Sequence, residues 1–125
     1  MRDHMESENR KDFEQTLTTF GHPRYELIAT GEVFEGEAQV RGYYEASRAA
    51  FPDQRNEVHE LYHLDDGVLV EFDLLGTHLG PLRGIAPTGR DFRCRMAALF
   101  LFDADLIVCE RVYFDSASIL RQLGL

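Results

Sequence analysis

A pair of histidines four residues apart matches a known metal-binding motif. Residues 59–63 read H-E-x-x-H, in which His59 and His63 would hold zinc and Glu60 would act as general base. The motif needs a helix, because on a strand the two imidazoles would stand roughly 13 Å apart at about 3.3 Å per residue. The neighbouring residues alternate as well as they follow a helical period, and Asp66 and Leu69 replace the glycine and third histidine of the extended motif. We therefore expect two histidines on a strand face and no metal, with a zinc hydrolase as an alternative.

A third histidine lies in a segment rich in residues with special backbone angles. Residues 76–89 hold four glycines and two prolines around His78, between two strand-like segments. Loops of this kind hold one shape, and loops on a rigid scaffold often carry sites. His78 either makes a hydrogen bond that pins the loop, or it is a cavity group able to transfer a proton near its ordinary pKa of about 6.5. We take it as a candidate catalytic residue.

The hydrophobic pattern predicts the elements that must position these groups. Helices are expected over residues 13–20, 40–51 and 116–123, and strands over 22–28, 67–78, 92–102 and 106–114. Helices followed by consecutive antiparallel strands indicate an α+β fold, with helices packed on one face of a curved sheet. Three short helices would not fill the concave side, so a cavity is expected there. On the strand 67–78, Phe72 shares the face of His78.

Composition narrows the function classes. The 125 residues, 44% hydrophobic and 28% charged, fit one globular domain. A net charge of −9 argues against nucleic acid or an anionic membrane as partner. No apolar run approaches the roughly 20 residues of a membrane span, and the charged first twenty residues lack a signal core. We expect a cytoplasmic protein. Cys94 and Cys109 are expected to be buried thiols.

An ordered set of short motifs resembles a known family. The set comprises Phe34-x-Gly36 before a Tyr43-Tyr44 helix, Phe51-Pro52-Asp53, Gly76-Thr77-His78-x-Gly80, Pro87-Thr88-Gly89-Arg90, Arg111-Val112-Tyr113-Phe114-Asp115 and Gln122-Leu123-Gly124. Over roughly residues 22–125 it is similar to the SnoaL-like polyketide cyclases of the nuclear-transport-factor-2-like superfamily. The resemblance implies a cone-shaped α+β barrel, in which a curved antiparallel sheet wraps around N-terminal helices and a pocket. It also implies pairing through the sheet, with residues 1–20 as a shortened helical lid.

The same resemblance implies aldol chemistry without metal or cofactor, run by an aspartate near the end of the last strand. That role falls on Asp115, which would need an apolar setting to raise its pKa. By alternation Arg111 and Tyr113 share its face and would bind substrate or steady an oxyanion. The alternative is that Asp115 only caps the following helix, worth about 1 kcal/mol. Glu71 and Glu110 are expected to be solvated carboxylates on the sheet.

Three functions from different classes follow from these residues. The first is a cofactor-independent cyclase, isomerase or hydratase acting on a hydrophobic carbonyl compound. The second is a non-catalytic domain that binds a hydrophobic ligand or dimerises, since one fold serves many functions. The third is the zinc hydrolase. The predicted site comprises Asp115 and His78 as catalytic residues and Arg111, Tyr113, Tyr43, Phe72 and Phe100 as substrate-binding residues. A homodimer is the expected assembly.

Overall fold

The computed structural model describes residues 2–10 and 12–125, without the side chains of residues 2, 3, 13 and 14. Along the chain the elements are α1 (Arg2–Asn9), α2 (Phe13–Thr18), β1 (Arg24–Leu27), β2 (Glu32–Glu35), α3 (Gly36–Ala50), β3 (Arg55–His63), β4 (Gly67–Thr77), β5 (Asp91–Asp103), β6 (Leu106–Tyr113) and α4 (Ser116–Leu123). No helix in this part of the chain is both long and apolar enough to cross a membrane.

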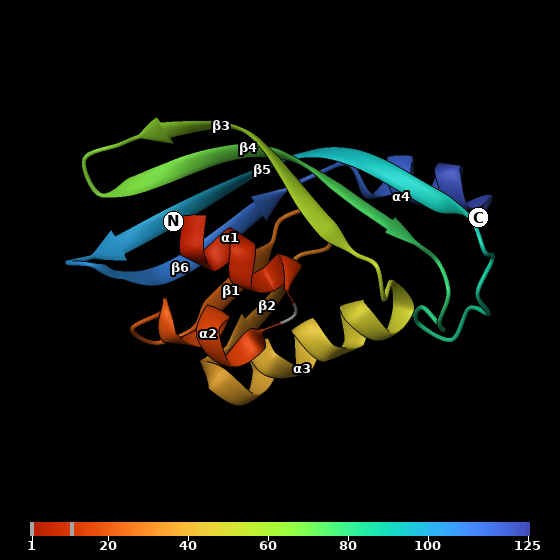
Figure 1. The fold of residues 1–125 in the computed structure, drawn as a ribbon, viewed down its shortest axis with the longest axis horizontal. Helices are drawn as coiled ribbons and strands as arrows, with labels where there is room; N and C mark the ends of the chain where they lie inside the picture. The colour runs from red at the N-terminus through yellow and green to blue at the C-terminus, as the bar shows by residue number, and fades with distance from the viewer. Residues whose placement is uncertain (1, 11) are drawn as a thin grey trace.

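One curved six-stranded sheet organises the molecule. Its order is β2-β1-β6-β5-β4-β3, and Figure 1 shows it arching over α1, α2 and α3. Adjacent strands are antiparallel except β1 and β6, which run parallel, so the expected antiparallel sheet has one exception. Because β2 and β3 lie at opposite edges, α3 carries the chain across the concave side. This crossover places a helix over the hollow of the sheet.

Alternation decides which side chains face that hollow. Along β4 and β5, Phe72 and Met96 lie opposite each other and are buried on the concave side. Asp73 and Arg95 are the next pair and hydrogen bond to each other on the outer face. Period-two alternation of apolar and polar residues is what a sheet with one covered face requires. The predicted strands over 67–78, 92–102 and 106–114 therefore match β4, β5 and β6 closely.

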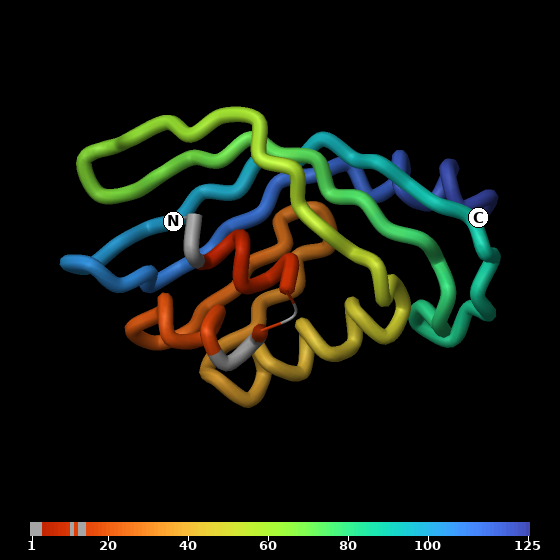
Figure 2. The backbone as a smooth tube through the Cα atoms, viewed as in Figure 1, coloured from red at the N-terminus to blue at the C-terminus, as the bar shows by residue number. Residues whose placement is uncertain are grey.

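The first twenty residues form two helices where one was expected, over 13–20. Helix α1 buries His4, Met5 and Glu8 although its sequence is mostly polar. It is fastened to β3 through Asn9, whose side chain donates to the Asn56 carbonyl at 3.0 Å and accepts from the Asn56 amide at 2.7 Å. Figure 2 shows this N-terminal segment running between the sheet and α3. The N-terminal helices thus lie on the concave side of the sheet, with α1 fastened to β3.

The two cysteines confirm the prediction of buried thiols. Cys94 on β5 and Cys109 on β6 are free and buried. Cys109 lies beside Leu101, and the next pairing along the strands joins Phe102 to Ile107 because the register shifts there. Because of this irregularity, the alternation of inward-facing and outward-facing residues on β6 changes phase along the strand.

Candidate functional site

A cavity of about 940 Å³ lies between the concave face of the sheet and α3. Its sheet side is apolar and includes Phe72, Met96 and Val112. Helix α4, which packs on β5, contributes Ile119 and Leu120 to the wall. A volume of this size is within the range of small-molecule sites, which are mostly apolar with a few polar groups placed among apolar ones.

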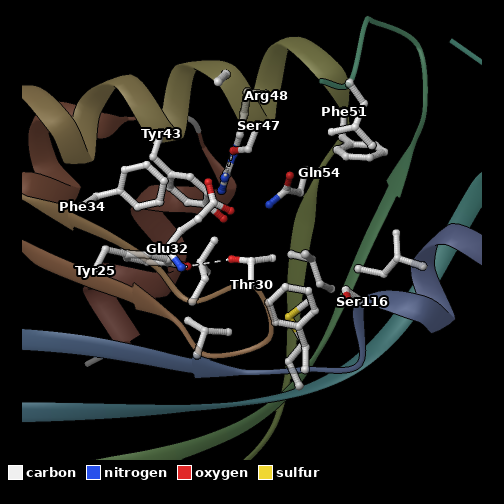
Figure 3. A pocket seen from close by; sticks show the side chains of 18 of the residues that line it. Tyr25, Thr30, Glu32, Phe34, Tyr43, Ser47, Arg48, Phe51, Gln54 and Ser116 are labelled. Atoms are coloured by element: carbon white, nitrogen blue, oxygen red, sulfur yellow. Dashed lines mark hydrogen bonds between the residues drawn. The ribbon is translucent and has the colours of Figure 1, made fainter. Parts of the chain in front are cut away.

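Aromatic rings form one side of the cavity. Tyr43 of α3 lies between Phe34 of β2 and Tyr25 of β1, with ring centroids 4.8 and 4.9 Å away. Figure 3 shows the three rings together and Ser47 and Arg48 descending from α3 beside them. Tyr43 and Phe72, both predicted to bind substrate, therefore line the cavity.

Three buried ionisable side chains meet where α1 approaches β6. Nε2 of His4 lies 2.8 Å from Oε1 of Glu110 and 3.4 Å from Oε1 of Glu8. The two carboxylates line the cavity, whereas the imidazole lies behind them and is fully buried. Asn56 donates to the other oxygen of Glu8 at 3.1 Å. The cavity thus has an acidic floor inside a largely apolar wall.

Hydrogen bonding assigns a positive charge to His4. The Thr19 hydroxyl donates to the Thr16 carbonyl at 2.6 Å, so its oxygen accepts from Nδ1 of His4 at 2.7 Å. Nε2 donates to the carboxylates, so both ring nitrogens carry protons. Burial alone would lower the pKa of His4, but the facing Glu110 and Glu8 carboxylates outweigh it and raise the pKa to about 10.

The two carboxyls respond differently to the same surroundings. Burial raises the pKa of Glu110 to about 7, with help from the negative charge of Glu8 and against the opposing effect of His4 and of a hydrogen bond from Tyr25. Burial acts on Glu8 too, but His4 and Arg48 overcome it and lower the pKa of Glu8. Near neutral pH Glu8 is an anion and Glu110 exchanges a proton. A carboxyl with a pKa near 7 in an apolar cavity suits acid/base chemistry.

The same trio is the set of described residues with the donor types and spacing for a divalent cation. Donor atoms of His4, Glu8 and Glu110 all lie within 4.8 Å of one another. In the structure they are joined by direct hydrogen bonds, as above. The predicted zinc motif offers no such meeting point: residues 59–63 lie on β3, and Nε2 of His59 pairs with Asp73 at 3.0 Å on the outer face. The preference for a strand over a zinc-binding helix is confirmed.

Asp115 lies at the start of α4 rather than in the cavity. Its carboxylate accepts from the amide of Ala117 at 3.0 Å, and its side chain is 67% exposed. Ser116, the next residue, lines the cavity, but Asp115 does not. The structure therefore shows Asp115 as a helix cap, the alternative role considered from the sequence. Its carboxyl is exposed and does not have the apolar surroundings that would raise its pKa.

His78 lies behind the cavity, not in it. Its Nδ1 accepts from the Thr88 amide at 3.2 Å and lies 3.1 Å from the Thr88 hydroxyl. Its backbone bonds to Arg90 and Gly89 at 2.9 Å each. The imidazole is fully buried, with the ring of Phe51 at 5.6 Å. These contacts hold residues 78–90 together, the loop-pinning interpretation of His78.

The remaining predicted contacts face away from the cavity. Arg111 bonds to Glu26 at 2.5 Å, and Tyr113 is 42% exposed. Both lie on the outer face of β6, and Asp115 follows the end of that strand at the start of α4. Phe100 is buried in the core, where its ring meets that of His4 at 5.2 Å. These placements do not bring the three residues to the cavity.

Sequence reasoning missed the residues that do form the polar floor. Glu110 was expected to be solvated and is 2% exposed, so that expectation is wrong. A signal was present, because Glu110 alternates with the apolar Val112 and Phe114, which also line the cavity. His4 and Glu8 stand four apart, the spacing of neighbours on a helix. Gln54 and Arg48 carried no comparable signal.

Comparisons with known proteins agree with this fold. The family model for the SnoaL-like polyketide cyclase matches residues 2–123. No curated protein matches the chain. Similar solved structures include IdmH of Streptomyces antibioticus, named as a candidate polyketide cyclase, at 24% identity, covering 99% of this chain and 95% of that one with a TM-score of 0.84.

Two further structures share the fold at lower identity. AclR of Streptomyces galilaeus, named as a candidate hydroxylase, has 20% identity, coverage of 98% and 90%, and a TM-score of 0.83. A ketosteroid isomerase-like protein of Catenulispora acidiphila has 21% identity, coverage of 99% and 91%, and a TM-score of 0.84. Their names differ in activity, so they support the fold alone. With the family model spanning nearly its whole length, the chain belongs to the SnoaL-like polyketide cyclase family.

Proposed function

We propose that this protein is an enzyme that enolises a hydrophobic carbonyl compound by acid/base catalysis, in an aldol cyclisation, isomerisation or hydration, without a metal or cofactor. Family membership supports a polyketide-cyclase-like cavity. The observation that carries the proposal is Glu110, a carboxyl 2% exposed at the floor of an apolar cavity, with its pKa raised to about 7. Glu110 takes the role that the sequence suggested for Asp115.

The proton that Glu110 removes from the substrate is returned to the product, so no other proton acceptor is needed. Ionised Glu110 removes a proton from the carbon beside the carbonyl, which leaves an enolate on the substrate and a neutral carboxylic acid on the protein. The acid then returns the proton to carbon or oxygen of the product. His4 remains an imidazolium throughout and limits repulsion between Glu8 and the ionised Glu110.

We assign stabilisation of the enolate oxygen to a phenol of the cavity. Tyr43 and Tyr25 line the cavity, and burial raises the pKa of Tyr43 to about 12. The Tyr43 hydroxyl therefore stays protonated at neutral pH and is able to donate to the enolate oxygen, whereas the Tyr25 hydroxyl already donates to Glu110. A donor aimed at a developing oxyanion in a site shielded from water contributes more than the same donor in water.

Deuterium uptake tests the proposal without knowledge of the natural substrate. The probe is 2-tetralone, a hydrophobic ketone whose exchange of α-hydrogens in D₂O is followed by NMR. We expect wild type to accelerate the exchange and Glu110→Gln to lose roughly 10²–10⁴-fold of that rate, the usual contribution of a general base. Exchange by wild type should rise with pH through about 7 and then level off, because the ionised form is the base.

Asp115→Asn is the matched control, since asparagine also caps helices. It should exchange at the wild-type rate, and a chelator should have no effect. Loss of exchange in Asp115→Asn, with Glu110→Gln unaffected, would return the role to Asp115. A rate that depends on added metal would contradict the cofactor-free mechanism. Tight binding of 2-tetralone with no exchange above buffer would favour the second candidate, a non-catalytic ligand-binding domain, which the largely apolar cavity also fits.

A further inference from the structure

Gln54 contributes a second kind of polar group to the cavity. Its side chain is a neutral amide, and it is far in sequence from the two carboxyls of the acidic floor. It lies between the end of α3 and the start of β3, lines the cavity, and is 7% exposed. Figure 3 shows its amide pointing into the cavity from the side of Phe51. The mechanism proposed above gives this side chain no task.

The amide of Gln54 makes no hydrogen bond with any residue that the structure describes. Its backbone donates to the Phe51 carbonyl at 3.0 Å, but its side-chain oxygen and nitrogen have no protein partner among them. Asn56, the other buried side-chain amide in this part of the chain, bonds to Glu8 at 3.1 Å. The Gln54 amide is not among the fully enclosed side-chain atoms that lack a partner, so it faces the cavity, where a ligand oxygen can replace the water that would otherwise bond to it.

The backbone around Gln54 is held in place. The neighbouring Asp53 carboxylate accepts from both the amide and the hydroxyl of Thr77, each at 2.7 Å. On β4, a side chain at Gly76 would meet Phe51 at 3.2 Å and the Gln54 Cα at 3.6 Å, so the absence of one lets this segment lie close to the strand. The amide is therefore presented from a fixed position, which reduces the conformational entropy lost when a ligand binds.

We propose that Gln54 is a ligand-binding residue that determines specificity by bonding to a second oxygen of the substrate, a hydroxyl or a carbonyl, while the enolisable carbonyl lies at Glu110. A carboxamide offers one acceptor and two donor hydrogens, so it pairs with either kind of oxygen. The substrate class is then a hydrophobic ketone with a further oxygen remote from the reacting carbonyl. The inference rests on the proposed function only in taking the cavity as the substrate site.

The test compares ligands that differ in one hydroxyl. Dissociation constants of 2-tetralone and of its 5-, 6- and 7-hydroxy derivatives are measured by calorimetry for wild type and Gln54→Met, a variant of similar shape without the amide. We expect wild type to bind at least one hydroxylated ketone about 10-fold more tightly than 2-tetralone, and Gln54→Met to lose that preference. Affinity for 2-tetralone itself should not fall in the variant.

Thermal unfolding separates ligand binding from a structural role. Removing an amide that bonds to no protein group should leave the melting temperature of the free protein nearly unchanged. Gln39→Met is the control. Gln39 also lines the cavity, but its side-chain oxygen already accepts a hydrogen bond from the backbone amide of Glu35 at 2.8 Å. That variant should keep the preference for the hydroxylated ligand.

Two results would overturn the inference: wild type prefers none of the hydroxylated ketones, or Gln54→Met melts several degrees lower and keeps the preference. Failure of the proposed function looks different. There, the binding preference would persist and depend on Gln54 while no variant, nor wild type, exchanged deuterium into the ketone.

Discussion

The buried cluster of His4, Glu8 and Glu110 predicts a marked dependence of folding stability on pH. The pKa of His4 is 6.5 in its ordinary state and about 10 in the folded protein, where two carboxylates accept from it. Because the folded-state pKa is the higher one, the stabilisation is complete below 6.5 and is lost as the pH rises toward 10. Linkage gives a loss of about 2–3 kcal/mol in the free energy of unfolding between pH 7 and pH 9.

Other groups with shifted pKa values change the stability mainly outside the interval between pH 7 and pH 9. Because the pKa of Glu110 is raised from 4.5 to about 7, its effect is a loss of stability as the pH rises between these two values, mostly below the interval. Burial raises the pKa of Cys94 and of Cys109 above 9.0, so they act at higher pH. Between pH 7 and pH 9 the slope therefore reports mainly on the proton held by His4, at most about 1.4 kcal/mol per pH unit.

Urea unfolding at several pH values measures this slope. The comparison is the double variant His4→Gln/Glu110→Gln. Removal of the imidazole alone would leave Glu8 facing Glu110, and two carboxylates so close would retain the proton themselves. The double variant should have nearly constant stability across the interval. A wild-type change below about 0.5 kcal/mol, or an equal slope in the double variant, would refute the charged state assigned to His4.

Three further predictions concern single residues of known geometry. Asp115→Ala should lower the free energy of unfolding by about 1 kcal/mol through loss of the cap to Ala117, and leave deuterium exchange into 2-tetralone intact; loss of exchange at full stability would contradict this. Gly80→Ala should destabilise by about 1–3 kcal/mol or more, because the added Cβ would lie 1.9 Å from the Ala49 carbonyl oxygen. Gly42→Ala, where a Cβ meets nothing within 4 Å on α3, should instead stabilise by about 0.5–1 kcal/mol in the same denaturation experiment.

The fold was largely accessible from the sequence because its long strands carry a strong pattern. Residues 67–78 and 116–123 were expected as a strand and a helix, and β4 and α4 have nearly these bounds. Helix α1 was missed because its eight residues are mostly charged and polar. Strand β2 spans only four residues and follows a turn, which gives too short a window for alternation to show.

The site was harder to predict because alternation identifies two faces of a strand without saying which one is covered. Arg111 and Tyr113 lie on the outer face of β6, and Asp115 follows the end of that strand as the cap of α4. Glu110, on the opposite face, is buried because α1 brings His4 to it from 106 residues away in the chain. From the sequence alone, a carboxylate on a strand is expected to be solvated. Its burial can be predicted only when the element that carries its partner, here α1 with His4, is known. Tertiary contacts, and not the local pattern, bury this residue at the cavity floor.

The most direct test of the account is the ionisation of Glu110 itself. A ¹³C NMR titration of the glutamate side-chain carboxyls, with Glu110→Gln to assign the resonance, measures its pKa in the free protein. The account predicts a midpoint of about 7. A midpoint at or below the ordinary value of 4.5 would contradict it, because such a carboxyl would be too weak a base for the chemistry proposed.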